Sequence, residues 1–94
     1  MIRVLIVDDS PTLRTVIQSV LEADPEMEIV GQARNGREAV MLCHKLNPDV
    51  VTMDIRMPVM DGYEAIQAIM SETPRPIVVV TSTKSDRELG ITFK

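Results

Sequence analysis

Residues 49–62 read Asp-Val-Val-Thr-Met-Asp-Ile-Arg-Met-Pro-Val-Met-Asp-Gly, and this stretch decides the fold. The mostly apolar run at residues 50–53 lies between turn signals, which predicts a short buried strand that ends at Asp54. A charged side chain at the carboxyl end of such a strand does not serve packing. Open parallel sheets bind ligands outside the carboxyl ends of their strands. We therefore predict that Asp54 is a carboxylate in a surface crevice, directed at a ligand.

The rest of the chain alternates strands and helices around this centre. Apolar runs predict strands at residues 2–7, 27–33 and 77–80, the second at a sheet edge and the other two buried. Helical periodicity predicts one helix that begins at Ser10-Pro11 and ends at Asp24-Pro25, and two more at 37–46 and 62–71. Residues 84–94 could begin a fourth helix, although Gly90 and the β-branched pair Ile91-Thr92 disfavour it. This order predicts an α/β fold with a parallel sheet and right-handed crossovers.

Each predicted helix has an apolar face that should point toward the sheet. The predicted inward residues are Leu13, Val16, Ile17, Val20 and Leu21 in the first helix, Ala39, Val40, Cys43 and Leu46 in the second, and Ala65, Ile66, Ile69 and Met70 in the third.

Size and charge restrict the classes of function. The chain has 94 residues, which is one small domain, and a net charge of −4, which argues against a nucleic-acid surface. A single cysteine suits a reducing compartment, so we expect a cytoplasmic protein. No apolar run approaches the length of a membrane span, and no signal-peptide pattern follows Met1.

Polar side chains follow three of the predicted strands, and parallel strands would bring them to one rim. These side chains are Asp8, Asp9, Asp54, Thr81 and Ser82. Three adjacent carboxylates repel one another, and a hard divalent cation such as Mg²⁺ would remove that conflict. One carboxylate would then remain able to attack phosphorus and form an acyl phosphate, whose oxygens could accept a hydrogen bond from Thr81.

Three motifs resemble the receiver domains of two-component response regulators. They are Val-Asp-Asp-Ser at 7–10, Met-Asp-Ile-Arg-Met-Pro-Val-Met-Asp-Gly at 53–62 and Val-Val-Val-Thr-Ser at 78–82. The resemblance implies the flavodoxin-like doubly wound sheet with strand order 2-1-3-4-5. It also implies that Asp54 accepts a phosphoryl group from a histidine kinase with Mg²⁺. It further implies that Asp8, Asp9 and Asp54 bind Mg²⁺ together with the Arg56 backbone carbonyl. Thr81 would be the switch hydroxyl, and Ser82 the small residue beside the phosphoryl site.

Within that family, the sequence is similar to those of the receivers of chemotaxis protein-glutamate methylesterases. The segments Ala-Arg-Asn-Gly-Arg-Glu-Ala at 33–39 and Pro-Arg-Pro-Ile-Val-Val-Val at 74–80 carry this similarity. It implies a receiver that regulates an esterase output domain or another effector. No esterase motif occurs in these residues, so we expect a signalling domain rather than an independent enzyme.

The chain departs from the family pattern at its C-terminal end. Receivers have a fifth strand that ends in a lysine, and then a fifth helix, whereas Lys84 and Lys94 do not stand at that position. Residues 1–94 are therefore expected to be a receiver domain that is incomplete at its C-terminus, with strand order 2-1-3-4. An exposed apolar edge at residues 77–80 would then favour a homodimer through residues 77–94. Phosphorylation would be weak, because the missing lysine would have neutralised charge on the phosphoryl group.

Other functions remain open from the residues alone. The chain could be an interaction or dimerisation module that is not phosphorylated, and Asp8 and Asp9 could merely cap the first helix. An Mg²⁺-dependent phosphatase with an aspartate nucleophile would need its first-strand acids two residues apart, whereas here they are adjacent. A dinucleotide-binding domain would need Gly-x-Gly-x-x-Gly after the first strand.

The remaining polar and sulfur-containing residues have ordinary interpretations. Asp61 is predicted to be a turn or cap residue, Cys43 a core residue and His44 a solvent-facing one. The methionines are predicted to pack rather than bind metal. The three arginines predicted to be surface charges are Arg14, Arg34 and Arg37.

Overall fold

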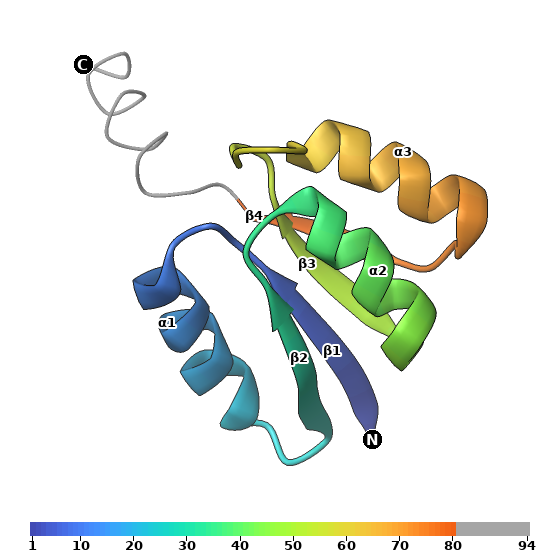
Figure 1. Cartoon of the computed structure of the whole chain (residues 1–94). Coiled ribbons are helices and arrows are strands. Elements are labelled where there is room, and N and C mark those ends of the chain that lie inside the picture. The colour runs from blue at the N-terminus through green and yellow to red at the C-terminus, as the bar shows by residue number, and fades with distance from the viewer. Residues whose placement is uncertain (81–94) are drawn as a thin grey trace, which may run out of the picture.

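A computed structural model describes residues 1–80 of the chain as four parallel strands and three helices (Figure 1). The elements are β1 (Ile2–Val7), α1 (Pro11–Glu22), β2 (Met27–Ala33), α2 (Gly36–Leu46), β3 (Val50–Asp54), α3 (Gly62–Glu72) and β4 (Ile77–Val80). The sheet order is β2-β1-β3-β4, and each neighbouring pair is parallel. The predicted α/β class and the flavodoxin-like order 2-1-3-4 are therefore confirmed.

The helices begin where the sequence places their capping residues. Ser10 caps α1 by accepting a hydrogen bond from the Leu13 backbone N–H at 3.2 Å, and Pro11 follows at the first helical position. Asn35 caps α2 in the same way. Asp61 begins α3 in a capping box with Glu64, which confirms its prediction as a cap residue.

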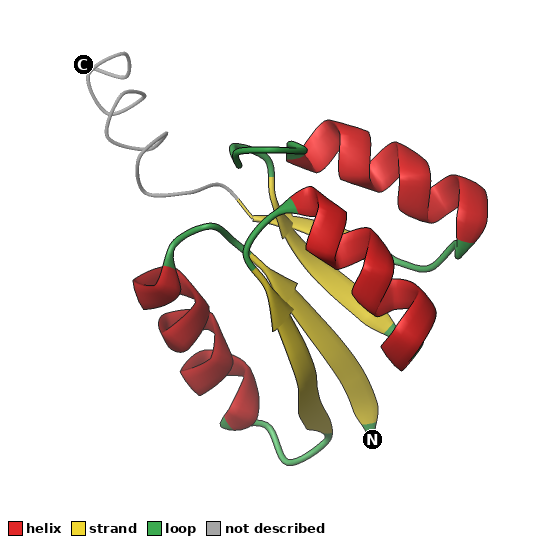
Figure 2. Cartoon of the chain, viewed as in Figure 1, coloured by secondary structure: helices red, strands yellow, loops and turns green. Residues whose placement is uncertain are grey.

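The helices cover both faces of the sheet. Figure 2 shows α2 and α3 together on one face and α1 on the other. The main core lies between the sheet and the α2–α3 layer, and its buried members are Leu5, Val7, Ala33, Ala39, Cys43, Val51, Met53, Ala65 and Ile69. Helix α1 packs over β1 and β2. No helix in residues 1–80 has the length and apolar character needed to cross a membrane.

Three details of the predicted core are wrong. Val16 and Val20 of α1 are exposed, and so is Met70 of α3, although helical periodicity placed them inward. Periodicity identifies the centre of an apolar stripe, but the neighbouring elements decide how wide a stripe is covered. Helix α1 lies over β1 and β2, so the side of α1 that carries Val16 and Val20 is left outside this packing.

Strand β4 is also less buried than predicted. Val78 and Val79 are about half exposed, and β4 pairs only with β3 among the described residues. A β-branched run looks the same in a central strand and in an edge strand, because burial depends on what covers the strand. Thr81, Ser82 and the helix considered at 84–94 lie outside the described residues.

Candidate metal centre

Three carboxylates converge at the carboxyl ends of two neighbouring strands. Asp8 and Asp9 directly follow β1, Asp54 is the last residue of β3, and the two strands pair in register up to Val7 and Met53. One ligand oxygen from each of the three aspartates lies within 4.8 Å of the others. The structure thus brings together the three acidic residues that the sequence placed on one rim.

The cluster lies deeper than the sequence suggests. Asp8 and Asp54 are each only 1% exposed, and Asp9 is half-buried. Asp54 is therefore more deeply buried than the predicted surface crevice suggests. Negative charges held close together away from water are costly, and a bound cation offsets that cost. The all-oxygen donor set fits a hard divalent cation.

The backbone around Asp8 holds its carboxylate in place. The Ser10 N–H donates to Asp8 Oδ1 at 2.9 Å, and the Asp8 N–H donates to the carbonyl oxygen of Ala33 at 3.0 Å. These bonds tie the residue both to the start of α1 and to the end of β2. Asp8 therefore has a fixed position in the cluster.

The loop between β3 and α3 closes around Asp54. The Arg56 N–H donates to Asp54 Oδ1 at 3.3 Å, and the Gly62 N–H donates to the Ile55 carbonyl oxygen at 2.8 Å. A Cβ at Gly62 would lie 2.5 Å from the Asp54 carbonyl oxygen, so only glycine fits there. The predicted metal contact of the Arg56 carbonyl stays a prediction.

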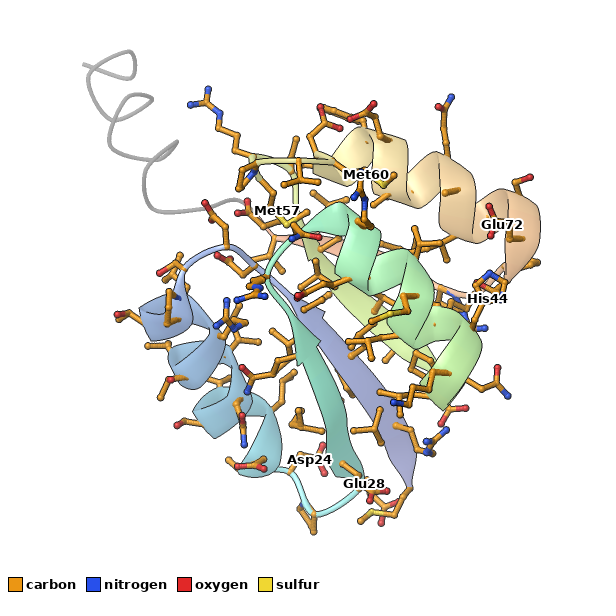
Figure 3. All side chains as sticks on the ribbon, viewed as in Figure 1. Asp24, Glu28, His44, Met57, Met60 and Glu72 are labelled. Atoms are coloured by element: carbon orange, nitrogen blue, oxygen red, sulfur yellow. The ribbon has the colours of Figure 1, made fainter. Side chains whose placement is uncertain are left out.

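The same loop contains a strained residue and a contact with α2. Val59 has φ +71°, and the Met60 N–H donates to the Pro58 carbonyl oxygen at 2.8 Å, which defines a tight γ-turn. The Met60 carbonyl oxygen accepts the Gly36 N–H at 2.9 Å. Figure 3 labels Met57 and Met60 in this loop. The loop therefore rests on the start of α2.

Arg14 is a residue of the site that sequence reasoning missed. It was predicted to be a surface charge, but its Nη1 donates to the Asp8 carbonyl oxygen at 2.6 Å. It is half-buried on α1, whereas Arg34 and Arg37 are exposed as predicted. The available signal was its place in the helical period, because Arg14 lies between Leu13 and Ile17 on the side of α1 that faces the sheet.

Other titratable side chains lie away from the cluster. The His44 imidazole meets the Glu72 carboxylate at 2.8 Å across α2 and α3, and both side chains are about half exposed (Figure 3). Cys43 is a core residue, as predicted, and burial raises the pKa of its thiol. Neither residue belongs to the candidate metal centre.

The comparison with known proteins identifies the family. A sequence model described as "Response regulator receiver domain" matches residues 4–93. A curated relative, "Protein-glutamate methylesterase/protein-glutamine glutaminase 2" of Methanospirillum hungatei, is 47% identical over 94 residues. That alignment covers 100% of this chain and 27% of the relative, so the chain spans about a quarter of the relative's length.

Two solved structures show the same fold. The response regulator domain of Thermotoga maritima CheB has a TM-score of 0.85 and 45% identity, over 87% of this chain and 61% of the other. The CheX-CheY-BeF3-Mg+2 complex of Borrelia burgdorferi has a TM-score of 0.78 and 32% identity, over 85% of this chain and 61% of the other.

The matched family model, the curated relative and the solved structures all indicate a receiver domain. These matches support neither the phosphatase nor the dinucleotide-binding alternative. The chain belongs to the family of response regulator receiver domains.

Proposed function

We propose that the chain is the phosphoacceptor part of a chemotaxis response regulator, and that Asp54 receives a phosphoryl group from a histidine kinase in the presence of Mg²⁺. The observation that carries this proposal is the convergence of Asp8, Asp9 and Asp54 within 4.8 Å at the ends of β1 and β3. It is supported by the solved relative whose complex contains BeF3 and Mg²⁺.

The proposed transfer needs little chemistry from the protein beyond position and charge. A carboxylate oxygen of Asp54 attacks the phosphorus of the kinase phosphohistidine, a P–O bond forms and the P–N bond breaks. The imidazole nitrogen keeps the electron pair of the broken bond. A bound Mg²⁺ would neutralise charge on the phosphoryl oxygens during this step.

Each remaining site residue has a proposed role in that step. The carboxylates of Asp8, Asp9 and Asp54 would hold the cation, and the Arg56 backbone carbonyl would be a fourth protein contact. Thr81 donates a hydrogen bond to the new phosphoryl group, and Ser82 leaves room for it. Val80, which precedes them, pairs in register with Asp54, and this pairing supports the assignment.

The partners are proposed from the names of the relatives. Because the 47% identical relative is a protein-glutamate methylesterase, we propose that this receiver regulates such an output domain in the cytoplasm. Residues 1–94 would then form part of the receiver. The half-exposed Val78 and Val79 support a second proposal, a homodimer contact in the region of residues 77–94.

Treatment of the 94-residue chain with acetyl phosphate and Mg²⁺ tests the phosphoacceptor assignment. Intact-mass spectrometry should detect the addition of one phosphoryl group, and omission of Mg²⁺ should abolish it. Asp54→Asn should remove the mass gain, whereas Asp49→Asn, at the other end of β3, should keep it. A mass gain that persists in Asp54→Asn would contradict the assignment.

A further inference from the structure

Arg14 links the acidic cluster to the neighbouring helix and strand. Its Nη1 donates to the carbonyl oxygen of Asp8 at 2.6 Å, and its Nε donates to Gln32 Oε1 at 3.0 Å. One guanidinium therefore joins α1 to the end of β1 and to β2. A planar guanidinium can donate to two acceptors at once in a fixed geometry, which a lysine ammonium cannot reproduce.

The orientation of Arg14 is itself fixed by a chain of side-chain hydrogen bonds. Gln32 Nε2 donates to Gln18 Oε1, and Gln18 Nε2 donates to Glu22 Oε2 at 3.1 Å. Gln18 and Glu22 belong to α1 and Gln32 belongs to β2, and Figure 1 shows these two elements next to each other. Two donor nitrogens of Arg14, Nη1 and Nε, therefore have acceptors before any ligand arrives.

The hydrogen bond from Arg14 to the Asp8 carbonyl oxygen adds to the backbone bonds that hold Asp8 in the acidic cluster. The Asp8 N–H is bonded to β2, and Asp8 Oδ1 is bonded to the start of α1. Arg14 adds a charge-assisted bond at the Asp8 carbonyl oxygen, so the peptide that joins Asp8 to Asp9 is also held. Loss of this bond would let that peptide rotate and would move both carboxylates.

We propose that Arg14 is a positioning residue, which fixes the Asp8–Asp9 peptide so that the two carboxylates are arranged for a divalent cation. This inference rests on the proposed function, because it concerns the same cation site. A simple charge effect predicts the opposite sign, since the positive guanidinium repels a cation and its removal would tighten cation binding. The direction of the change in affinity therefore distinguishes positioning from charge.

Titration of the 94-residue chain with Mn²⁺, followed by electron paramagnetic resonance of the free ion, tests the proposal. Arg14→Gln should raise the dissociation constant for Mn²⁺ by about tenfold, a size typical for the loss of a residue that orients metal ligands. Arg3→Gln is the matched control, because it removes the same charge at the opposite end of β1, where Arg3 Nη1 bonds to the Asn47 carbonyl oxygen. The control should bind Mn²⁺ as the unsubstituted chain does.

Two further variants keep the test decisive if Arg14→Gln is poorly folded, which circular dichroism would report. Gln32→Ala removes one acceptor of Arg14 without changing charge and should weaken Mn²⁺ binding in the same direction, but by less. Arg14→Lys should restore affinity only in part.

Unchanged or tighter binding by folded Arg14→Gln, or by Gln32→Ala if Arg14→Gln is unfolded, would overturn the positioning role. Absence of Mn²⁺ binding by the unsubstituted chain would instead overturn the proposed cation site.

Discussion

Individual residues of the β3–α3 loop carry strain next to Asp54. Val59 has φ +71°, a region that costs a β-branched residue energy because its Cβ meets the neighbouring backbone. Strained residues that persist in a fold are concentrated at functional sites. The loop that follows the candidate phosphoacceptor is therefore held in a conformation that its own sequence disfavours.

The substitution Val59→Gly should stabilise the fold by about 1 kcal/mol, because glycine adopts positive φ without strain. Little packing would be lost, since Val59 is 68% exposed. Urea unfolding measures the change. Val20→Gly is the control at a similarly exposed valine inside helix α1, and it should destabilise the fold by about 0.5 kcal/mol, because glycine has the lower helix propensity. A loss of stability in Val59→Gly would show that relief of φ strain is outweighed by the other effects of the substitution.

Gly62 should not tolerate even a methyl group. Gly62→Ala would bring a Cβ to 2.5 Å from the Asp54 carbonyl oxygen and 2.6 Å from Ile55 Cα, both backbone atoms. We expect a loss of at least about 2 kcal/mol in urea unfolding, the range of overpacked core positions. Gly31→Ala is the comparison, because its nearest contact is the flexible end of Leu46 at 2.7 Å, and it should cost less. Equal losses would contradict the role of the Asp54 backbone contact.

The three clustered aspartates could be predicted from the sequence, but the residues around them, Arg14 and Val59, could not. Asp8, Asp9 and Asp54 stand at strand ends, and parallel strands leave one place where their side chains can meet. Arg14 and Val59 could not be assigned in the same way. The role of Arg14 depends on the position of a backbone carbonyl, and the strain at Val59 depends on a turn geometry that valine does not signal.

The secondary-structure elements depend on polar residues at their ends. Helix α3 begins with the capping box of Asp61 and Glu64, in which the Glu64 N–H donates to Asp61 Oδ1 at 2.9 Å. Although Asp61 is acidic and lies in the same loop as Arg56, its carboxylate is used for the helix rather than for the cluster. Asp61 can therefore be separated experimentally from the three clustered aspartates.

Asp61→Ala should cost about 1 kcal/mol of stability in urea unfolding, the usual contribution of an N-cap. The same variant should bind Mn²⁺ with unchanged affinity, because Asp61 is not in the acidic cluster. Asp9→Ala should do the reverse, with a large loss of Mn²⁺ affinity and little loss of stability. A loss of Mn²⁺ affinity in Asp61→Ala as large as in Asp9→Ala would contradict the assignment of Asp61 as a cap.

The bounds of the elements could be read from the sequence because local signals mark both ends. Strands β2 and β4 match the predicted ranges, and α2 begins one residue earlier than predicted, after the Asn35 cap. The widths of the buried helix faces could not be read in the same way. They depend on which strands lie beneath a helix, and this is a property of the sheet order rather than of the helix sequence.

In the molecule as a whole, strand β4 exposes apolar side chains that favour association with a second copy of the chain. Val78 is 53% exposed on a strand that pairs only with β3 among the described residues. Exposed apolar edges pair with other chains unless a charge protects them. The sequence predicted such an edge, although it also predicted burial for the strand itself.

Val78→Lys should reduce self-association, measured as the weight-average mass in sedimentation equilibrium at high protein concentration. Met41→Lys is the matched control, since Met41 is 54% exposed on α2, away from β4. The control should associate as the unsubstituted chain does. A monomeric unsubstituted chain, or equal effects of the two lysines, would contradict a dimer contact at β4.

We propose that acidic residues distant in the chain form one cation site at the carboxyl ends of β1 and β3. Paramagnetic broadening by substoichiometric Mn²⁺ in the ¹H–¹⁵N spectrum tests it most directly, because the effect falls steeply with distance from the ion. The amide signals of Asp8, Asp9, Asp54 and Arg56 should broaden first. The competing acidic surface contains Asp24, in the turn between α1 and β2, and Glu28, near the start of β2, at the opposite end of the sheet (Figure 3). Broadening centred on that turn, with the signal of Asp54 unchanged, would contradict the account.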